Sequence, residues 1–212
     1  GVASTKAYTA QLFVFYLLAF YLAQLRNSLP AQKIGKYLKE LRRVPALQRE
    51  VLKQQNEIGR LARMHSHFGS FLYLGRNINF PSALEGALKL KEISYIPAEG
   101  YAAGEMKHGP IALIDEYRAV VCISPLSKVY EKMYSNIQEI KSRRGKLIAI
   151  ATQGDVKIKK LTTEVIYIPR IEEFFSPLIV ALPLQLLAYH ISTKRGCDVD
   201  QPRNLAKSVT VE

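Results

Sequence analysis

The opening quarter of the chain has a helical pattern, and its first segment is apolar on nearly every side. Residues 5–27 place large apolar side chains at most positions, and residues 12–23 contain no charge. A helix that is hydrophobic all round is buried in a core or pressed into an interface. A membrane span needs about 20 apolar residues, whereas runs of about 10–14 are more often core helices. We therefore predict a buried helix here and no membrane span.

Two amphipathic helices are expected next, with a proline between them. Residues 31–44 place Ile34 and Leu38 on one face, and residues 47–64 repeat the same helical spacing. Proline removes a backbone donor and breaks helical hydrogen bonding. We therefore expect Pro45 to end one helix and restart the chain.

From residue 68 onward, short apolar strands alternate with helices. The predicted strands cover residues 70–74, 118–124, 146–151 and 164–168. The predicted helices cover residues 82–95, 128–144 and 175–193, with a short turn at 111–113. This alternation predicts an α/β fold whose parallel sheet is covered by helices on both faces. Ligands of such sheets bind beyond the carboxyl ends of the strands, which here are residues 75–76, 124–125 and 152–153.

The charge balance narrows the classes of partner. Thirty Lys and Arg residues against 18 Asp and Glu give a net charge of +12, which raises nucleic acid as a candidate partner. The densest runs, at 141–146 and 157–160, have no interleaved aromatic residues, so we interpret them as solvated faces. Dispersed positive charge suits an anionic small substrate such as a sugar phosphate. The sequence has no glycine-rich dinucleotide or Walker motif.

The cysteines indicate the redox environment of the chain, and its first residues bear on whether it is a piece of a longer protein. Cys122 and Cys197 lack the spacing of a metal site or a disulfide framework, and a reducing cytoplasm fits them. Cys122 lies within an apolar strand and is expected to be a buried thiol. Lys6 alone does not make the charged region of a signal peptide. The chain begins at Gly1 with a helix-capping Ser-Thr pair, which suggests a piece of a longer protein.

One predicted helix carries the strongest candidate for chemistry. Glu85, Lys89 and Glu92 follow i, i+4, i+7 spacing and therefore share one face of the helix at residues 82–95. On a surface helix this is an ordinary stripe of salt bridges. Near a strand end, a carboxylate beside a lysine can serve as a positioned base. The residues alone leave both interpretations open.

A loop histidine and the C-terminal tail add two further candidates. His108 lies in a loop with Gly100, Gly104 and Gly109, where it is either an acid/base group near neutral pH or a locally hydrogen-bonded side chain. His190, in the last apolar helix, is expected to be a satisfied core or interface histidine.

The tail, residues 200–212, is polar and carries Lys207. Ordinary tails fray, but alternating valines in this one favour docking, which would make Lys207 a lid residue. A carboxylate, a histidine and an amine that can form an imine together suit proton transfer in an open-chain sugar.

Several long stretches resemble one enzyme family. These are GVASTKAYTAQ at 1–11, ALEGALKLKEISYI at 83–96, AAGEMKHGPIALI at 102–114, ALPLQLLAYH at 181–190 and DQPRNLAKSVTVE at 200–212. Over its whole length the chain resembles the isomerase domain of the glutamine:fructose-6-phosphate amidotransferases, also called glucosamine-6-phosphate synthases. The resemblance implies two parallel-sheet α/β units of the sugar isomerase (SIS) type in the parent. It divides this chain into the helical end of the first unit (1–56), the second unit (57–199) and an active-site tail (200–212).

The resemblance also implies roles for the candidate residues. By the family's motif, Glu92 is the base that moves a proton between C1 and C2 of the sugar. Lys207 forms an imine with the open-chain ketose, and His108 opens the sugar ring from across a dimer interface. Lys89 lies beside the base with Glu85 as its partner on the helix. The remaining implied contacts to the sugar are made by Val2 and Ala206.

The resemblance implies partners as well. These are fructose 6-phosphate and glucosamine 6-phosphate, a glutaminase domain of the same parent chain and a second copy in a cytoplasmic homodimer. No cofactor, nucleic acid or membrane is implied. Because the glutaminase domain and the phosphate-gripping loop of the first SIS unit are absent from the sequence, we expect these 212 residues to be inactive alone.

Two other interpretations stay open. One is a phosphosugar-binding SIS module of a regulator, although no helix-turn-helix pattern supports it. The other is a structural dimerisation half, which the apolar helices at residues 5–27 and 175–193 make plausible.

Overall fold

A five-stranded parallel sheet forms the centre of the molecule in the computed structural model, which describes residues 2–205. The strands are β1 (Phe71–Gly75), β2 (Ala98–Ala102), β3 (Ala119–Ser124), β4 (Lys146–Thr152) and β5 (Val165–Ile168). Their order in the sheet is β2-β1-β3-β4-β5, and every neighbouring pair is parallel. The predicted α/β class and parallel sheet are therefore confirmed.

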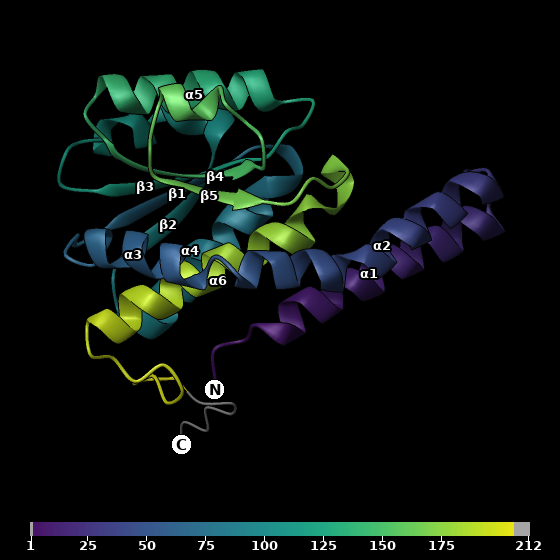
Figure 1. The fold of residues 1–212 in the computed structure, drawn as a ribbon, viewed down its shortest axis with the longest axis horizontal. Coiled ribbons are helices and arrows are strands. Elements are labelled where there is room, and N and C mark those ends of the chain that lie inside the picture. The colour runs from purple at the N-terminus through teal and green to yellow at the C-terminus, as the bar shows by residue number, and fades with distance from the viewer. Residues whose placement is uncertain (1, 206–212) are drawn as a thin grey trace.

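Helices cover both faces of this sheet (Figure 1). The helices are α1 (Lys6–Leu25), α2 (Ala31–Leu52), α3 (Gln55–His65), α4 (Phe80–Ser94), α5 (Tyr130–Ser142) and α6 (Ser176–Lys194). Helix α5 covers one face, and α3, α4 and α6 cover the other. Each crossover between parallel strands needs such a connecting element, which explains the alternation in the sequence.

The strands bury side chains on both faces, so the core has two parts. On β1, Phe71 and Tyr73 pack toward α4 and α6, whereas Leu72 and Leu74 pack toward α5. All five residues of β1 and all six of β3 are buried, as expected for strands inside a parallel sheet. Cys122 on β3 is fully buried, as predicted, and burial raises the pKa of its thiol.

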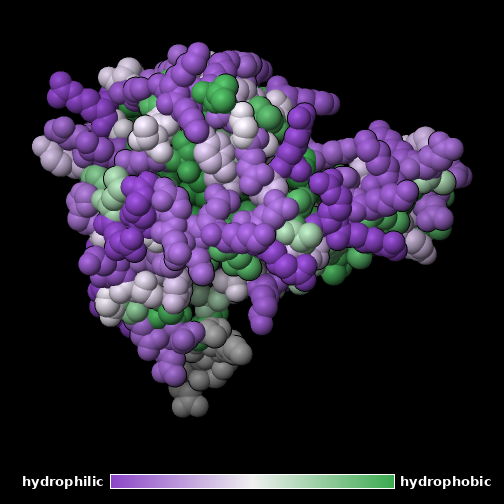
Figure 2. Space-filling view, viewed as in Figure 1, coloured by the Kyte–Doolittle hydropathy of each residue, from purple (hydrophilic) through white to green (hydrophobic). Residues whose placement is uncertain are grey.

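Helices α1 and α2 form an arm that extends from the sheet domain (Figure 1). The prediction of a buried helix at residues 5–27 is wrong for this chain, because within α1 only Tyr16 and Phe20 are buried. Val14, Phe15 and Leu25 are each at least 60% exposed. Figure 2 shows hydrophobic residues along the lower edge of this arm, below a mostly hydrophilic surface.

Within residues 2–205, two segments have the length and composition of a membrane span: Lys6–Leu25 and Glu173–Lys194. The second contains α6, and 67% of its most apolar window is buried, which identifies it as a core helix. For α1 the buried share is 11%. The apolar helix is 20 residues long, so the argument that the run is too short to span a membrane no longer holds.

Several boundaries differ from the predictions. The helix expected over residues 47–64 is divided, because α2 ends at Leu52 and α3 begins at Gln55. Pro45 lies inside α2 and does not break it, because Leu41, Val44 and Leu47 hold the helix to the core on both sides of the proline. The loop expected around Gly100 contains strand β2. A Cβ atom at Gly100 would lie 2.8 Å from the Leu84 backbone nitrogen, so glycine permits the close packing of β2 on α4.

Candidate active site

Helix α4 brings the three predicted residues Glu85, Lys89 and Glu92 together. The Lys89 Nζ atom lies 2.5 Å from Glu92 Oε2 and 3.9 Å from Glu85 Oε1. The Lys89 and Glu85 side chains are 4% and 9% exposed, so this is not an ordinary stripe of surface salt bridges. One buried ammonium between two carboxylates is instead a compact charged cluster with a net negative charge when both acids are ionised.

Glu85 is the member of this cluster whose ionised form is disfavoured by burial. Burial is the main cause that raises the pKa of its carboxyl, and the nearby Glu92 raises it further. Lys89 and the Gln185 amide act in the opposite direction. Glu85 Oε1 has no hydrogen-bond partner among residues 2–205. A buried carboxylate oxygen left unpaired is costly, which favours the neutral form of Glu85.

Of the three cluster residues, Lys89 lines a cavity of about 270 Å³ between the two ends of the described chain. Lys89 and Ile93 of α4 line it together with Ala3, Thr5, Gln185, Tyr189, Val199 and Asp200. Val2, one of the predicted contact residues, is half-buried and directly precedes Ala3. The segment before α1 and the segment after α6 thus meet beside the Lys89 amine.

The first part of the predicted tail docks on the end of α4. The backbone N–H of Arg203 donates to the Tyr95 hydroxyl at 2.8 Å, and the Arg203 guanidinium lies 4.2 Å from the Tyr95 ring centre. Pro202 is buried. Tyr95 is the residue that ends α4, three positions after Glu92. Lys207 and Ala206 lie outside the described residues, so their predicted roles stay predictions.

His108 lies on the other face of the sheet from this cluster. It ends a short helical turn, Ala103–His108, whose Ala103 and Met106 pack into the core on the α5 side. The His108 side chain is 74% exposed, and its Nδ1 atom lies 2.8 Å from Glu105 Oε2. Within one chain, His108 therefore does not join Glu85, Lys89 and Glu92.

The carboxyl edge of the sheet, where ligands were expected, holds a different arrangement. Glu173 Oε2 accepts the backbone N–H of Lys128 at 2.9 Å, so a side chain of the protein itself satisfies that donor. Helix α4 starts at this edge, and it rises about 1.5 Å per residue, which places Glu92 roughly 18 Å along the helix. The expectation that the acid–lysine helix would present its pair beside the strand end is therefore wrong.

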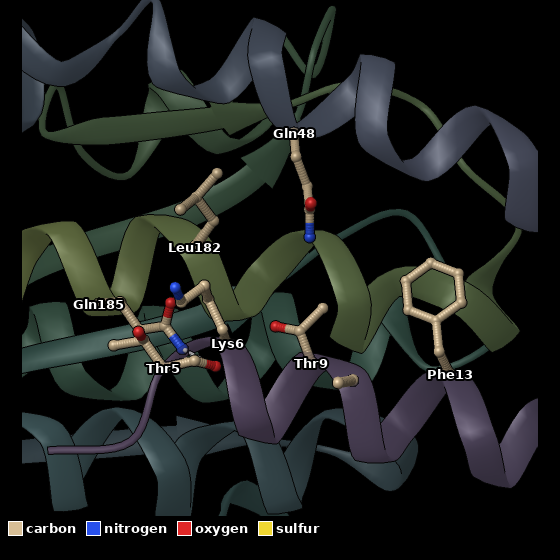
Figure 3. A pocket seen from close by; sticks show the side chains of 8 residues that line it. Thr5, Lys6, Thr9, Phe13, Gln48, Leu182 and Gln185 are labelled. Carbon is tan, nitrogen blue, oxygen red and sulfur yellow. Dashed lines mark hydrogen bonds between the residues drawn. The ribbon is translucent and has the colours of Figure 1, made fainter.

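A second cavity of about 400 Å³ adjoins the first (Figure 3). Thr5 and Gln185 line both cavities, and the Gln185 Nε2 atom donates to the Thr5 carbonyl at 3.5 Å. Sequence reasoning did not select Gln185 or Tyr95 as site residues. Gln185 is a polar residue within an otherwise apolar helix, and that contrast was the available signal.

The other histidines lie away from the cavity, and one prediction about them is wrong. His190 was expected to be satisfied, but its buried Nε2 atom has no partner among the described residues, and burial lowers its pKa. His65 pairs with Glu164, with 2.9 Å between Nε2 and Oε2. Within residues 2–205 no group of three or more His, Cys, Asp or Glu side chains could hold a metal ion.

Comparison with protein families identifies the sheet domain. The SIS domain matches residues 67–195, which is more than half of the chain. The chain belongs to the SIS domain family. The match begins just after α3 and ends just after α6, so it contains the sheet, α4 and Gln185.

Relatives of this SIS chain confirm the resemblance to the amidotransferases. It is 53% identical to glutamine--fructose-6-phosphate aminotransferase [isomerizing] of Thermus thermophilus and 54% identical to that of Chlorobaculum tepidum. Both matches cover 100% of this chain but 35% and 34% of the relatives, so the chain spans about a third of their length.

Solved structures agree with both the fold and the resemblance. The C-terminal domain of glucosamine-fructose-6-phosphate aminotransferase from Francisella tularensis has a TM-score of 0.90 and 43% identity, covering 95% of this chain and 57% of that chain. Tagatose-6-phosphate ketose/aldose isomerase from Escherichia coli has a TM-score of 0.67 at 19% identity, covering 78% and 47% of the two chains. This second similarity supports the SIS fold alone.

Proposed function

We propose that this chain is the sugar-isomerising part of an enzyme that makes glucosamine 6-phosphate from fructose 6-phosphate and ammonia released from glutamine. The observation that carries the proposal is the pair formed by the buried Lys89 and the partly buried Glu92, beside a cavity that both ends of the described chain line. The names of the relatives support the choice of substrates. Because the chain spans about a third of those relatives, the complete activity belongs to the longer protein, and these 212 residues alone are inactive.

The reaction needs an amine transfer and a proton transfer, and it is redox-neutral. The ketose carbonyl at C2 condenses with the Lys207 amine, releasing water, and ammonia displaces that lysine to leave an imine at C2. A base then removes a proton from C1 while the imine nitrogen takes up a proton, which gives an aminoenol. A proton is returned at C2 as the C1 hydroxyl loses its proton. The product is an aldehyde at C1 with an amine at C2. General acid–base catalysis of this kind contributes about 10²–10⁴-fold.

We assign the proton transfer to Glu92, whose side chain is 21% exposed and whose ion-pair partner Lys89 lines the cavity. Lys89 holds this carboxylate, and Glu85 is the second acid on the same helix. Val2 and Ala206 contact the sugar through their backbone. His108 opens the sugar ring of a neighbouring copy, which its exposure and its place on the other face of the sheet support. The same arrangement requires a homodimer, which we place in the cytoplasm.

Glu92→Gln in the full-length protein tests the proton-transfer role. The substitution keeps shape and polarity but removes the base, so isomerisation is expected to fall by at least about 100-fold. Binding of fructose 6-phosphate, measured by calorimetry, is expected to persist. Glu99→Gln is the matched control, because Glu99 is exposed on β2 and pairs with Tyr101. Loss of binding without loss of turnover in the bound state would contradict the assignment of Glu92 as the base and favour a role for Glu92 in binding the sugar.

Lys207→Ala tests the imine. Borohydride reduces an imine to a stable amine, so the wild-type full-length protein treated with fructose 6-phosphate is expected to gain the mass of the sugar phosphate less one oxygen atom. The variant is expected to gain none. Lys194→Ala, which changes the last residue of α6, is a control with the same chemical change. An adduct retained by Lys207→Ala would move the imine to another lysine.

A further inference from the structure

The last residues of α4 receive hydrogen bonds from the end of α6 and from the chain that follows it. The Ser192 hydroxyl donates to the Ile93 carbonyl, and the Cys197 Sγ atom lies 3.9 Å from the Ser94 carbonyl oxygen. Carbonyl groups in the last turn of a helix have no partner within the helix. The chain at and beyond the end of α6 thus pairs with groups that α4 itself leaves open.

Tyr95 is the next residue along, and it makes two contacts with the C-terminal segment. Its hydroxyl accepts the backbone N–H of Arg203 at 2.8 Å, and the Arg203 guanidinium lies 4.2 Å from the centre of its ring. The first distance is that of an ordinary hydrogen bond, and the second brings the cation close enough for attraction by the ring. Pro202 is buried, so the chain is held at two successive residues.

The backbone of Tyr95 has a conformation that disfavours a tyrosine. Its φ is 61° and its ψ is 16°, which is the left-handed region. At the end of a helix this conformation is usually taken by glycine, which has no Cβ atom to clash. For a bulky residue it is an outlier, and such outliers gather at functional sites, where the surrounding structure imposes them. The tyrosine side chain at this position therefore has a functional role, and its contacts with Arg203 indicate which one.

Anchoring the chain at Arg203 limits the distance from the anchor to Lys207. A chain extends by at most about 3.6 Å per residue, so the two Cα atoms lie no more than about 14 Å apart. Residues 199–200, just before the anchored pair, line the cavity together with Lys89. An anchor on Tyr95 thus keeps the amine that the proposed function assigns to the imine close to that cavity.

We propose that Tyr95 is a positioning residue that seats the C-terminal segment on the end of the helix that carries Glu92, and thereby holds Lys207 at the cavity. Tyr95 follows Glu92 by three positions, so one helix end places both the base and the segment that bears the amine. In this role the phenol group acts on the chain and not on the sugar. The inference rests on the proposed function in assigning the imine to Lys207.

Trypsin cleavage after Arg203 in the full-length protein measures the seat without any activity. Trypsin binds the Arg203 side chain in its own pocket, so the segment must leave Tyr95 before it is cut. When reclosing is fast, the rate follows the population of the open form. Tyr95→Phe keeps the ring but loses the hydroxyl, and it is expected to raise the rate about fivefold.

Tyr95→Asn loses both contacts and is expected to raise the rate of cleavage after Arg203 about 20-fold. Asparagine adopts the left-handed conformation more readily than tyrosine, so this variant is expected to fold. Tyr117→Asn is the matched control, because it makes the same chemical change at a side chain that is 74% exposed. The control is expected to be cut after Arg203 at the wild-type rate.

The borohydride-trapped adduct with fructose 6-phosphate tests the consequence for Lys207. In Tyr95→Asn, the adduct formed at a fixed short time and kcat are both expected to fall about tenfold, because the amine is less often in position. KM is expected to stay nearly unchanged, since Tyr95 does not contact the sugar in this proposal. Tyr95→Phe is expected to lie between Tyr95→Asn and the wild type.

The two measurements separate the inference from the proposed function. Wild-type rates of cleavage after Arg203 in both Tyr95 variants overturn the inference. Faster cleavage with a wild-type adduct yield and a wild-type kcat also overturns it, because the seat then does not position Lys207. A wild-type full-length protein that forms no adduct contradicts the proposed function instead, and the cleavage series still decides whether Tyr95 seats the segment.

Discussion

Helices α1 and α6 are both apolar in sequence, but α6 lies in the core and most of α1 is exposed. Both are long and apolar on nearly every side, yet 67% of the apolar window around α6 is buried, against 11% for α1. Helix α6 packs against α3, α4 and α2, while α1 contacts α2 and α6 and places its two buried side chains in one aromatic cluster. An apolar pattern on all sides thus predicts that a helix is buried, but it does not identify the element or molecule that buries it.

The cluster that anchors α1 shows how limited its attachment is. Tyr16 and Phe20 pack edge-on against Phe175, and the Tyr16 hydroxyl donates to the Phe174 carbonyl at 2.5 Å. Beyond these contacts the outer face of α1 presents Phe15 and its apolar neighbours to the surface. Large exposed apolar patches mark sites of interaction with other molecules.

The largest expected effect is on the free energy of unfolding, and it separates the buried helix α6 from the exposed helix α1. Leu184→Ala removes a fully buried side chain of α6, and truncations of this type cost about 2–5 kcal/mol of unfolding free energy. Phe15→Ala on α1 removes a side chain that is 65% exposed and is expected to cost less than about 0.5 kcal/mol. Urea unfolding of the 212-residue chain with each substitution measures the difference.

A large loss of stability in Phe15→Ala would mean that the α1 face is covered in solution. Light scattering on the same samples distinguishes the sources of such a cover. A concentration-dependent mass would assign it to a second copy of the chain, and a constant monomer mass would assign it to a different packing of the arm.

Much of the fold could be predicted from the sequence because apolar strands and amphipathic helices have distinct periods. Strands β1, β3, β4 and β5 and helices α4, α5 and α6 lie within a few residues of their predicted positions. Strand β2 was missed because its five residues include Gly100 and polar neighbours, so it lacks the apolar run that marks a central strand. The strand order is not encoded in any local pattern.

The candidate site was predictable in part. Helical spacing places Glu85, Lys89 and Glu92 on one face, and the structure brings the three together. The burial of Lys89 depends on α6 and on the segments at both ends of the described chain, which no local pattern reveals. For the same reason the sequence did not indicate Gln185 or the pairing of Tyr95 with Arg203.

Two glycines within helices test the difference between a buried and an exposed helix face, with a smaller expected effect on stability. A Cβ atom at Gly86 of α4 would lie 2.9 Å from the Tyr73 ring and 3.0 Å from Leu184, whereas one at Gly35 of α2 would meet nothing within 4 Å. Alanine in a helix is favoured over glycine by about 0.5–1 kcal/mol. Overpacking a core costs about 1–3 kcal/mol, which outweighs that gain at Gly86.

Gly86→Ala is therefore expected to destabilise the chain by about 1 kcal/mol, and Gly35→Ala to stabilise it by about 0.5 kcal/mol. Thermal unfolding of both variants beside the wild type gives the two signs. Stabilisation by Gly86→Ala would mean that side chains of α6 and β1 move to accommodate the extra methyl group. The packing between α4 and α6 would then be less tight than the burial of α6 indicates. Destabilisation by Gly35→Ala would mean that the open face of α2 is in contact with another molecule in solution.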